Sequence, residues 1–251
     1  MMKIPTLNML SVVSRKGCDA LRRAFPGLRR RIQLPMPGRF QPYNHTLPNR
    51  YPWLFRYARA CLGDTQDLRI LSFGCSRGEE VFTLRHYFPA AAIKGIDIDP
   101  RNIVHCLARA RREKCAEVAF AAAATTEAEQ AESYDAIFCL AVLCHGDLAT
   151  SGAQRCDPLL RFEDFERMVV DFARCLKPGG LLLLHTTSFR FCDTSASKDF
   201  DSVLEADPAQ LAPDAVFDRD NRLMEGVRYR DVAFRKRGTA ARKTTTTSVS
   251  R

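Results

Sequence analysis

A short glycine-containing segment, GCSRG at residues 74–78, stands between a run of apolar residues and a helical pattern. A strand that ends in such a turn places backbone N–H groups at the carboxyl edge of a sheet, where α/β proteins bind ligands. Glycine in a tight turn also has a purely conformational explanation. The segment therefore indicates a ligand-binding loop only when a second signal accompanies it.

An acidic residue supplies that second signal. Asp97 lies 19 residues after Gly78, at the end of the next apolar run, close to the offset of about 20 residues at which a carboxylate meets ribose hydroxyls. The neighbouring Asp99, followed by Pro100, suits a helix N-cap with proline at the first helical position. We therefore assign Asp97 to a ribose and Asp99 to the cap.

The elements that must position these residues alternate along the chain. Apolar runs predict strands at 68–73, 92–96, 118–123, 134–140 and 181–187, and helical spacing predicts helices at 51–62, 79–88, 101–114 and 162–176. This alternation implies a mainly parallel sheet covered on both faces. Near the end, apolar segments at 216–217 and 227–234 flank a polar loop and predict an antiparallel hairpin at the sheet edge.

Composition divides the chain into three parts. Residues 1–49 form a basic, Pro-rich N-terminal arm, residues 50–237 carry the alternating pattern, and residues 238–251 are rich in Thr, Ser and Arg without apolar periodicity. The last part is predicted to be a disordered tail. With 46% hydrophobic and 27% charged residues in the whole chain, a packed globular domain is expected.

Several classes of protein are disfavoured by what the sequence lacks. No stretch approaches the roughly 20 apolar residues of a membrane-spanning helix. The ten cysteines contain no CxxC pair, so reduced and mostly buried thiols are expected rather than a disulfide framework. The five histidines show no metal-ligand spacing, and no metal site is expected.

The net charge of +9 is concentrated at the ends of the chain. A basic arm can attract nucleic acid, an anionic membrane or an acidic protein, but without interleaved aromatic residues or a binding motif a solvated arm is expected and nucleic acid is not indicated. Its Arg-rich, acid-poor composition also resembles a mitochondrial transit peptide. The predicted location is the cytoplasm, with the mitochondrial matrix as the alternative.

Four motifs in order resemble those of class I S-adenosylmethionine-dependent methyltransferases. They are LSFGCSRGEE at 71–80, GIDIDP at 95–100, YDAIFCLAVL at 134–143 and LKPGG at 176–180. The GCSxGEE form of the first motif is closest to the chemotaxis-receptor glutamate methyltransferases, although their helical N-terminal domain has no counterpart in the Pro-rich arm. The resemblance implies an α/β, Rossmann-like, mainly parallel seven-stranded sheet with helices on both faces and a C-terminal antiparallel hairpin.

The resemblance also implies S-adenosyl-L-methionine as the cofactor. The implied cofactor-binding residues are Gly74, Cys75, Ser76, Gly78, Asp97, Ile98 and Leu140. The glycine loop would lie against the methionine part, Asp97 would bind the ribose hydroxyls, Ile98 would flank the adenine, and Leu140 would close the pocket beneath the sulfonium. Two departures stand out: Ser72 replaces the acid that many members carry in the first strand, and residues 120–126 offer no acid for the adenine amino group.

Methyl transfer requires alignment of a nucleophile and, for a hydroxyl or amine, removal of a proton. His145 and His185 follow or end predicted strands and are the candidate bases, against the alternatives of a loop residue and a satisfied core histidine. In the arm and just after it, Tyr43, His45, Tyr51 and Trp53 are expected to help form a lid over the substrate pocket. The alternative is that Trp53 and Tyr57 only pack the helix at 51–62 on the sheet.

The predicted function is transfer of a methyl group to an O or N nucleophile, of a small molecule, with a protein carboxyl (glutamate) methyltransferase as one alternative. GCSRG also fits the Gly-x-Ser-x-Gly elbow of an α/β hydrolase, with Ser76 as nucleophile, but few strands precede it. A dehydrogenase would carry a third glycine where Glu79 stands. A cofactor-binding module without turnover is a further alternative, because fold does not fix function.

Overall fold

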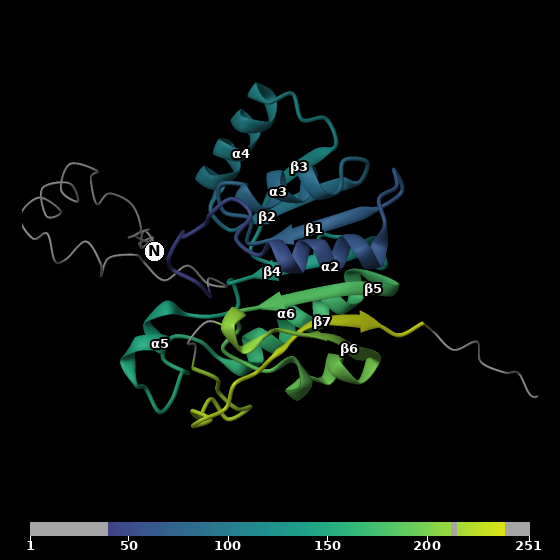
Figure 1. Cartoon of the computed structure of the whole chain (residues 1–251). Coiled ribbons are helices and arrows are strands. Elements are labelled where there is room, and N and C mark those ends of the chain that lie inside the picture. Colours follow the sequence, from purple (N-terminus) through teal and green to yellow (C-terminus); the bar gives the residue numbers. More distant parts are fainter. Residues whose placement is uncertain (1–39, 212–214, 239–251) are drawn as a thin grey trace, which may run out of the picture. The chain divides into compact units, whose positions relative to one another are not determined.

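One mixed sheet forms the centre of the domain in the computed structural model, which describes residues 40–211 and 215–238 (Figure 1). Its strand order is β3-β2-β1-β4-β5-β7-β6. The strands are β1 (Arg69–Phe73), β2 (Ala92–Asp97), β3 (Val118–Ala122), β4 (Tyr134–Leu140), β5 (Leu176–His185), β6 (Phe200–Glu205) and β7 (Asp231–Lys236). The first five strands pair in parallel, and β7 runs antiparallel to both β5 and β6. The predicted fold class is confirmed.

Helices cover both faces of this sheet, and Figure 1 shows α2 in front of the strands with α6 behind them. The helices are α2 (Pro52–Leu62), α3 (Glu79–Tyr87), α4 (Pro100–Arg112), α5 (Gly146–Ser151) and α6 (Phe162–Cys175). Short 3-10 turns at Phe191–Asp193, Ser195–Asp199 and Pro208–Gln210 connect the later elements.

The two faces have separate hydrophobic cores because successive side chains of a strand point to opposite sides. In β4, Ile137 and Cys139 pack with α6, whereas Ala136 and Phe138 pack with α2, α3 and α4. All four side chains are fully buried. This double burial explains the continuous apolar sequence of β4, since a strand covered on both faces needs no polar alternation.

The start of α4 fixes the direction in which the chain leaves β2. Asp99 is the N-cap, and its side chain accepts a hydrogen bond from the Arg101 backbone N at 2.9 Å, with Pro100 at the first helical position. The predicted cap is confirmed. The cap leaves Asp97, two residues earlier, at the carboxyl end of β2.

The antiparallel pair at the sheet edge has a different first strand from the predicted one. β6, with the sequence FDSVLE, pairs with β7, while residues 216–217 lie outside the sheet and Phe217 makes isolated bridges to Phe189 and Leu223. The prediction of a strand at 216–217 was wrong, because Phe217 makes only isolated bridges, and its fully buried ring packs against that of Phe189. Of the six residues of β6 only Phe200 is buried, so this strand carries a weaker apolar signal than the central strands do.

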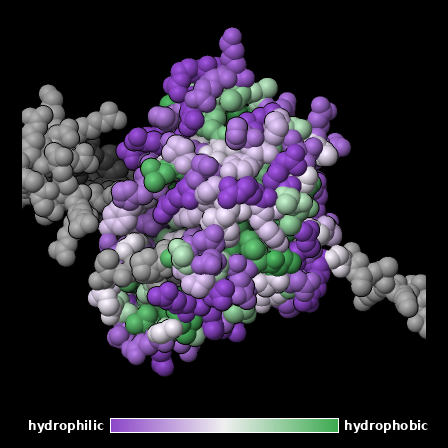
Figure 2. Space-filling model, viewed as in Figure 1, coloured by the Kyte–Doolittle hydropathy of each residue, from purple (hydrophilic) through white to green (hydrophobic). Residues whose placement is uncertain are grey.

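The predictions for residues 1–39 and for most of the tail concern parts of the chain outside the described residues. Among the described residues, no helix combines the length and apolar character needed to cross a bilayer. Figure 2 shows the same view of the surface, on which small apolar groups are scattered among hydrophilic residues.

We predict that Gly95→Ala destabilises the domain. A Cβ at Gly95 in β2 would lie 2.8 Å from Phe120 Cδ1 and 2.9 Å from both Cys75 Sγ and Val81 Cγ2. Overpacking of this kind costs about 1–3 kcal/mol, and urea unfolding of the purified variant measures it. Gly238→Ala is the matched control, since a Cβ there has no atom within 4 Å; equal stability of the two variants would contradict the packing of β2 described here.

Candidate active site

A cavity opens at the carboxyl ends of β1, β2 and β4. Together with the space at its open mouth, it has an empty volume of about 950 Å³. Its floor comes from the loop after β1, from Asp97 and Ile98 after β2, and from Leu140, Ala141 and Val142 after β4. Its outer wall comes from residues 40–50, which we call the strap. The carboxyl edge of a parallel sheet is the usual ligand site of α/β folds.

The loop after β1 holds a conformation that depends on its glycines. Gly74 and Gly78 have φ angles of +74° and +92°, and Ser76 also has a positive φ of +51°. A Cβ on Gly74 would overlap the Val142 side chain. The Gly74 and Cys75 backbone N atoms donate to the Ile96 carbonyl at 2.7 and 2.9 Å, which holds the loop against the end of β2.

Asp97 connects this loop to the next helix. Its Oδ2 accepts from the Ser76 backbone N at 2.8 Å, and its Oδ1 accepts from the Asp99 backbone N at 2.8 Å and from Asn102 Nδ2 at 3.0 Å. The residue is only 7% exposed and lines the cavity. Three N–H donors therefore fix the orientation of this carboxylate in the floor of the cavity.

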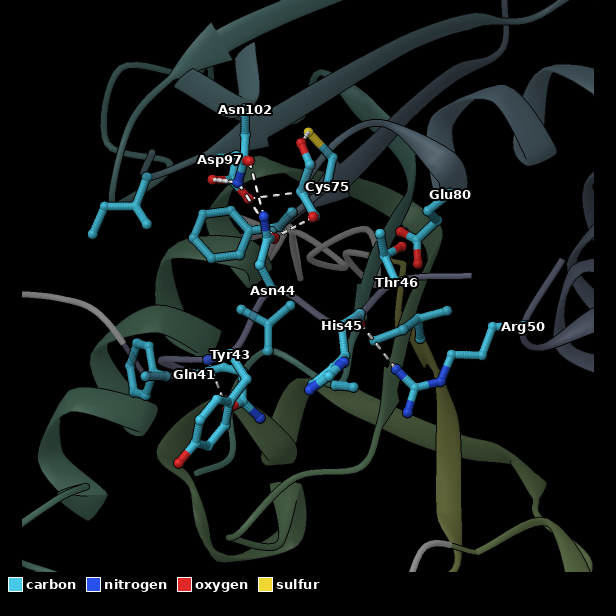
Figure 3. Close-up of a pocket in the computed structure, with 18 of the residues that line it drawn as sticks. Gln41, Tyr43, Asn44, His45, Thr46, Arg50, Cys75, Glu80, Asp97 and Asn102 are labelled. Atoms are coloured by element: carbon cyan, nitrogen blue, oxygen red, sulfur yellow. Dashed lines mark hydrogen bonds between the residues drawn. The ribbon is translucent and has the colours of Figure 1, made fainter. Parts of the chain in front are cut away.

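The strap adds Asn44 to the hydrogen bonds that join Ser76, Asp97 and Asn102. Asn44 Nδ2 donates to Asn102 Oδ1 at 3.0 Å, and the Ser76 hydroxyl donates to Asn44 Oδ1. Asn44, Ser76, Asp97 and Asn102 thus form a closed circuit of hydrogen bonds, which we call the polar ring. Figure 3 shows Asn44 pointing from the strap toward Asn102 and Asp97.

The strap is held at both ends and near its middle. Phe40 is buried in the core on the α6 side of the sheet. The Tyr43 hydroxyl donates to Asp147 after β4. At the other end the Asn49 backbone N donates to Thr83 Oγ1 at 3.1 Å, and Asn49 Oδ1 accepts from the Tyr87 hydroxyl at 3.1 Å. These contacts place the strap across the mouth of the cavity.

A buried carboxylate lies in another part of the cavity. Glu80 of α3 accepts a hydrogen bond from Ser72 Oγ at 2.7 Å. Burial raises the pKa of Glu80 to about 7, against the opposing influence of the Ser72 hydrogen bond and the Arg50 charge. β1 has Ser72 instead of an acidic residue, and the carboxylate of Glu80 in α3 lies beside that serine.

Arg50 provides positive charge on the same side of the cavity. It is the one lysine or arginine among the described residues that line the cavity. Its Nη1 donates to the His45 carbonyl at 3.4 Å, and its guanidinium lies 5.2 Å from the centre of the Tyr51 ring. Figure 3 shows Arg50 and Glu80 on the same side of the cavity, away from the polar ring.

The structure brings most of the predicted cofactor residues together. Those that line the cavity are Gly74, Cys75, Ser76, Asp97, Ile98 and Leu140. Gly78 stands behind them as the residue before α3, with its backbone N donating to the Cys75 carbonyl at 2.9 Å. Asn44, Arg50, Glu80 and Asn102 were not predicted; the GEE sequence after the loop was a signal for Glu80.

The two predicted bases lie outside the residues that line this cavity. His145 caps α5, and its Nδ1 accepts from the Asp147 backbone N at 3.3 Å. His185 is buried, and burial lowers its pKa to about 4. Its Nε2 donates to the Gln210 carbonyl at 3.1 Å, and its Nδ1 is 2.7 Å from Thr186 Oγ1. The histidine that does line the cavity is His45 of the strap.

Comparison with known proteins gives a family match. The model of a methyltransferase domain matches residues 64–226. No protein of curated function matches the sequence.

Solved structures that resemble part of this chain are distant in sequence. Phosphoethanolamine N-methyltransferase 2 of Haemonchus contortus, in complex with S-adenosyl-L-methionine, is 20% identical with a TM-score of 0.43, covering 56% of this chain and 29% of that one. Geranyl diphosphate C-methyltransferase of Streptomyces coelicolor A3(2) is 16% identical with a TM-score of 0.40, covering 53% and 45%. Coclaurine N-methyltransferase is 14% identical with a TM-score of 0.38, covering 53% and 35%. The chain thus spans less than half the length of each of these proteins.

We predict that Glu80 makes the stability of the domain depend on pH. Its pKa rises from an ordinary value of 4.5 to about 7 in the folded state, mainly through burial. The folded state therefore binds this proton more tightly than the unfolded chain does. The resulting stability is fully present below about pH 4.5 and is lost as the pH rises through about 7, for a total of about 3 kcal/mol.

Urea unfolding between pH 4 and 8 measures this effect as the difference between the wild type and Glu80→Gln. Other carboxylates titrate in both proteins, so the difference reports Glu80 alone. Parallel profiles for the two proteins would show that Glu80 is not desolvated.

Proposed function

We propose, from the premise that this chain belongs to the methyltransferase-domain family, that its cavity binds S-adenosyl-L-methionine and that it methylates an oxygen or nitrogen nucleophile of a small molecule. The domain at residues 64–226 is that of an S-adenosylmethionine-dependent methyltransferase. The observation that carries the proposal is the buried carboxylate of Asp97 beneath the glycine loop, in the same cavity as Glu80 and Arg50.

The nucleoside end of the cofactor fits the side of the cavity formed by the ends of β1 and β2. Asp97 offers a charged acceptor for a ribose hydroxyl, and hydrogen bonds to a charged partner are stronger than those between neutral groups. Ile98 and Leu140 offer apolar surface beside it. Ala123 and Ala124, after β3, bring no acidic side chain, so the adenine amino group would be met by backbone or solvent.

The amino acid end fits the pair formed by Glu80 and Arg50. An α-ammonium group favours the ionised form of Glu80, since an opposite charge nearby lowers the pKa of a carboxyl. An α-carboxylate pairs with the planar guanidinium of Arg50, which can donate two hydrogen bonds. Both side chains line the cavity, and the charge of Arg50 already acts on Glu80.

The protein needs to supply orientation and a dry site rather than extensive acid–base chemistry. When bound, the cofactor supplies a methyl group that its sulfonium makes electrophilic. The strap excludes water from the mouth of the cavity, and Tyr43 and Tyr51 line that region. For a hydroxyl or ammonium acceptor, the imidazole of His45 is the proposed proton acceptor, since it is the histidine that lines the cavity among the described residues.

A small acceptor is proposed because the strap crosses the mouth and is fastened on both sides. Ser76 is not proposed as a hydrolase nucleophile. Its hydroxyl donates to Asn44, and neither His145 nor His185 is among the residues that line its cavity in the described part of the chain. An activated serine requires a base within hydrogen-bonding reach.

We expect titration calorimetry to detect binding of both S-adenosylmethionine and S-adenosylhomocysteine. Asp97→Asn is expected to weaken both affinities by about tenfold to a hundredfold, because a charged acceptor becomes neutral. Asp64→Asn is the matched control: Asp64 also accepts from two backbone N atoms, those of Ala90 and Ala91, but it is not among the residues that line the cavity. Absence of binding, or equal affinities for the Asp97 and Asp64 variants, would overturn the cofactor assignment.

The affinity for S-adenosylhomocysteine is predicted to rise with pH and to level off above about pH 7. Glu80, whose pKa in the unliganded cavity is about 7, must be ionised to attract an α-ammonium group, so protonation costs up to about tenfold in affinity per pH unit below that value. This ligand lacks the sulfonium charge, so the dependence reports the amino acid end. Glu80→Gln should bind weakly at every pH; a wild-type affinity independent of pH would argue against this role.

A further inference from the structure

We propose that Asn44 of the strap completes the ribose site by accepting one of the two ribose hydroxyls, which makes the strap part of the cofactor site. This inference rests on the proposed function and adds to it a residue outside the segment that matches the family. It starts from the number of hydrogen bonds that Asp97 already accepts.

Asp97 has too few unoccupied acceptor positions for a ribose diol. A carboxylate offers about four lone-pair positions on its two oxygens. Oδ1 accepts from the Asp99 backbone N and from Asn102 Nδ2, and Oδ2 accepts from the Ser76 backbone N. One position on Oδ2 is left, so Asp97 can accept one hydroxyl while it keeps the loop and α4 in place.

The three existing bonds are costly to give up. The Ser76 bond fixes the middle of the cofactor loop, and the Asp99 bond lies at the start of α4. The third bond comes from Asn102 Nδ2. All three donors belong to buried residues, and a buried donor without a partner costs about 1–3 kcal/mol. A second hydroxyl is therefore accommodated by another acceptor rather than by displacement of these groups.

The polar ring offers the Asn44 amide oxygen as a further acceptor, bonded to the same residue, Ser76, whose backbone N donates to Asp97 Oδ2. The orientation of Asn102 is set by Asp97, because a carboxylate only accepts, so Asn102 Nδ2 points to Asp97 and its Oδ1 receives Asn44 Nδ2. Asn44 Oδ1 then receives the Ser76 hydroxyl and a longer contact of 3.4 Å from Asn102 Nδ2. That contact lies outside the usual range for N–H···O hydrogen bonds, and a hydroxyl can take its place at little cost.

A hydrogen bond between Asn44 and a ribose hydroxyl would affect the whole strap. Asn44 itself is exposed, whereas Ser76, Asp97 and Asn102 are buried. A hydroxyl held between Asp97 and Asn44 would connect the floor of the cavity to its outer wall. The bound cofactor would then add a contact between the strap and the floor, and it is recognised by its complete diol.

The test compares three probes: S-adenosylhomocysteine and its 2′-deoxy and 3′-deoxy counterparts. Calorimetry is done on the full chain as wild type and as Asn44→Ala. We expect Asn44→Ala to weaken S-adenosylhomocysteine about threefold to tenfold, the range for one neutral hydrogen bond. One of the two deoxy ligands, the one without the hydroxyl that Asn44 holds, should bind both proteins equally, while the other should show the same loss as the parent ligand.

Asn49→Ala is the matched control, because Asn49 lies on the same strap but contacts Tyr87 of α3 instead of the polar ring. It should affect all three ligands alike. If Asn44→Ala also weakens the binding of all three ligands equally, Asn44 acts only through the strap and the proposal is overturned. The proposal is also overturned if Asn44→Ala leaves the affinity for S-adenosylhomocysteine unchanged. Unfolding midpoints show whether the variants are folded. A wild type that binds none of the three ligands would refute the proposed function itself.

Discussion

The carboxylate of Asp97 is the interaction on which the rest of the site depends. It lies at the end of β2, where the parallel strands meet the cavity, and holds the loop after β1 and the start of α4 through backbone N–H groups. Gly95, two residues earlier, lets Cys75, Val81 and Phe120 approach this strand closely. The negative charge that a nucleoside would meet is thus also the charge that shapes its binding loop, and any substitution at this position acts on both.

The central fold could be predicted from the sequence because its signals are local. The loop at 74–78, Asp97 and the Asp99–Pro100 cap all lie within about 25 residues, and each strand before β6 has an apolar run of its own. The edge of the sheet could not be predicted in the same way. β6 has a mixed sequence with one buried residue, and it pairs with a strand that begins 26 residues after β6 ends. The aromatic Phe217 resembles a strand residue, but its buried ring packs against that of Phe189.

The site was predicted less completely than the fold because it depends on where side chains point. His145 and His185 were chosen for their positions after or within strands, but the ring of His185 packs 4.6 Å from the ring of Tyr51, with hydrogen bonds to Gln210 and Thr186. Glu80 was recognisable only as part of a motif, since its contact with Ser72 requires the turn between them to fold back. The finer resemblance to chemotaxis-receptor methyltransferases stays a prediction.

The strap also changes where the determinants of the methyl acceptor should be sought. His45, Arg50 and Tyr43 all lie before residue 64, outside the segment that matches the family, yet they line the same cavity as the glycine loop. Within the matched segment, the cavity residues come from the ends of β1, β2 and β4 and from the segments that follow β1, β2, β3 and β4. These residues are the ones proposed to hold the cofactor. On this view the same short segment excludes water, completes the ribose site and selects the nucleophile, so substitutions in the strap should affect cofactor and acceptor together.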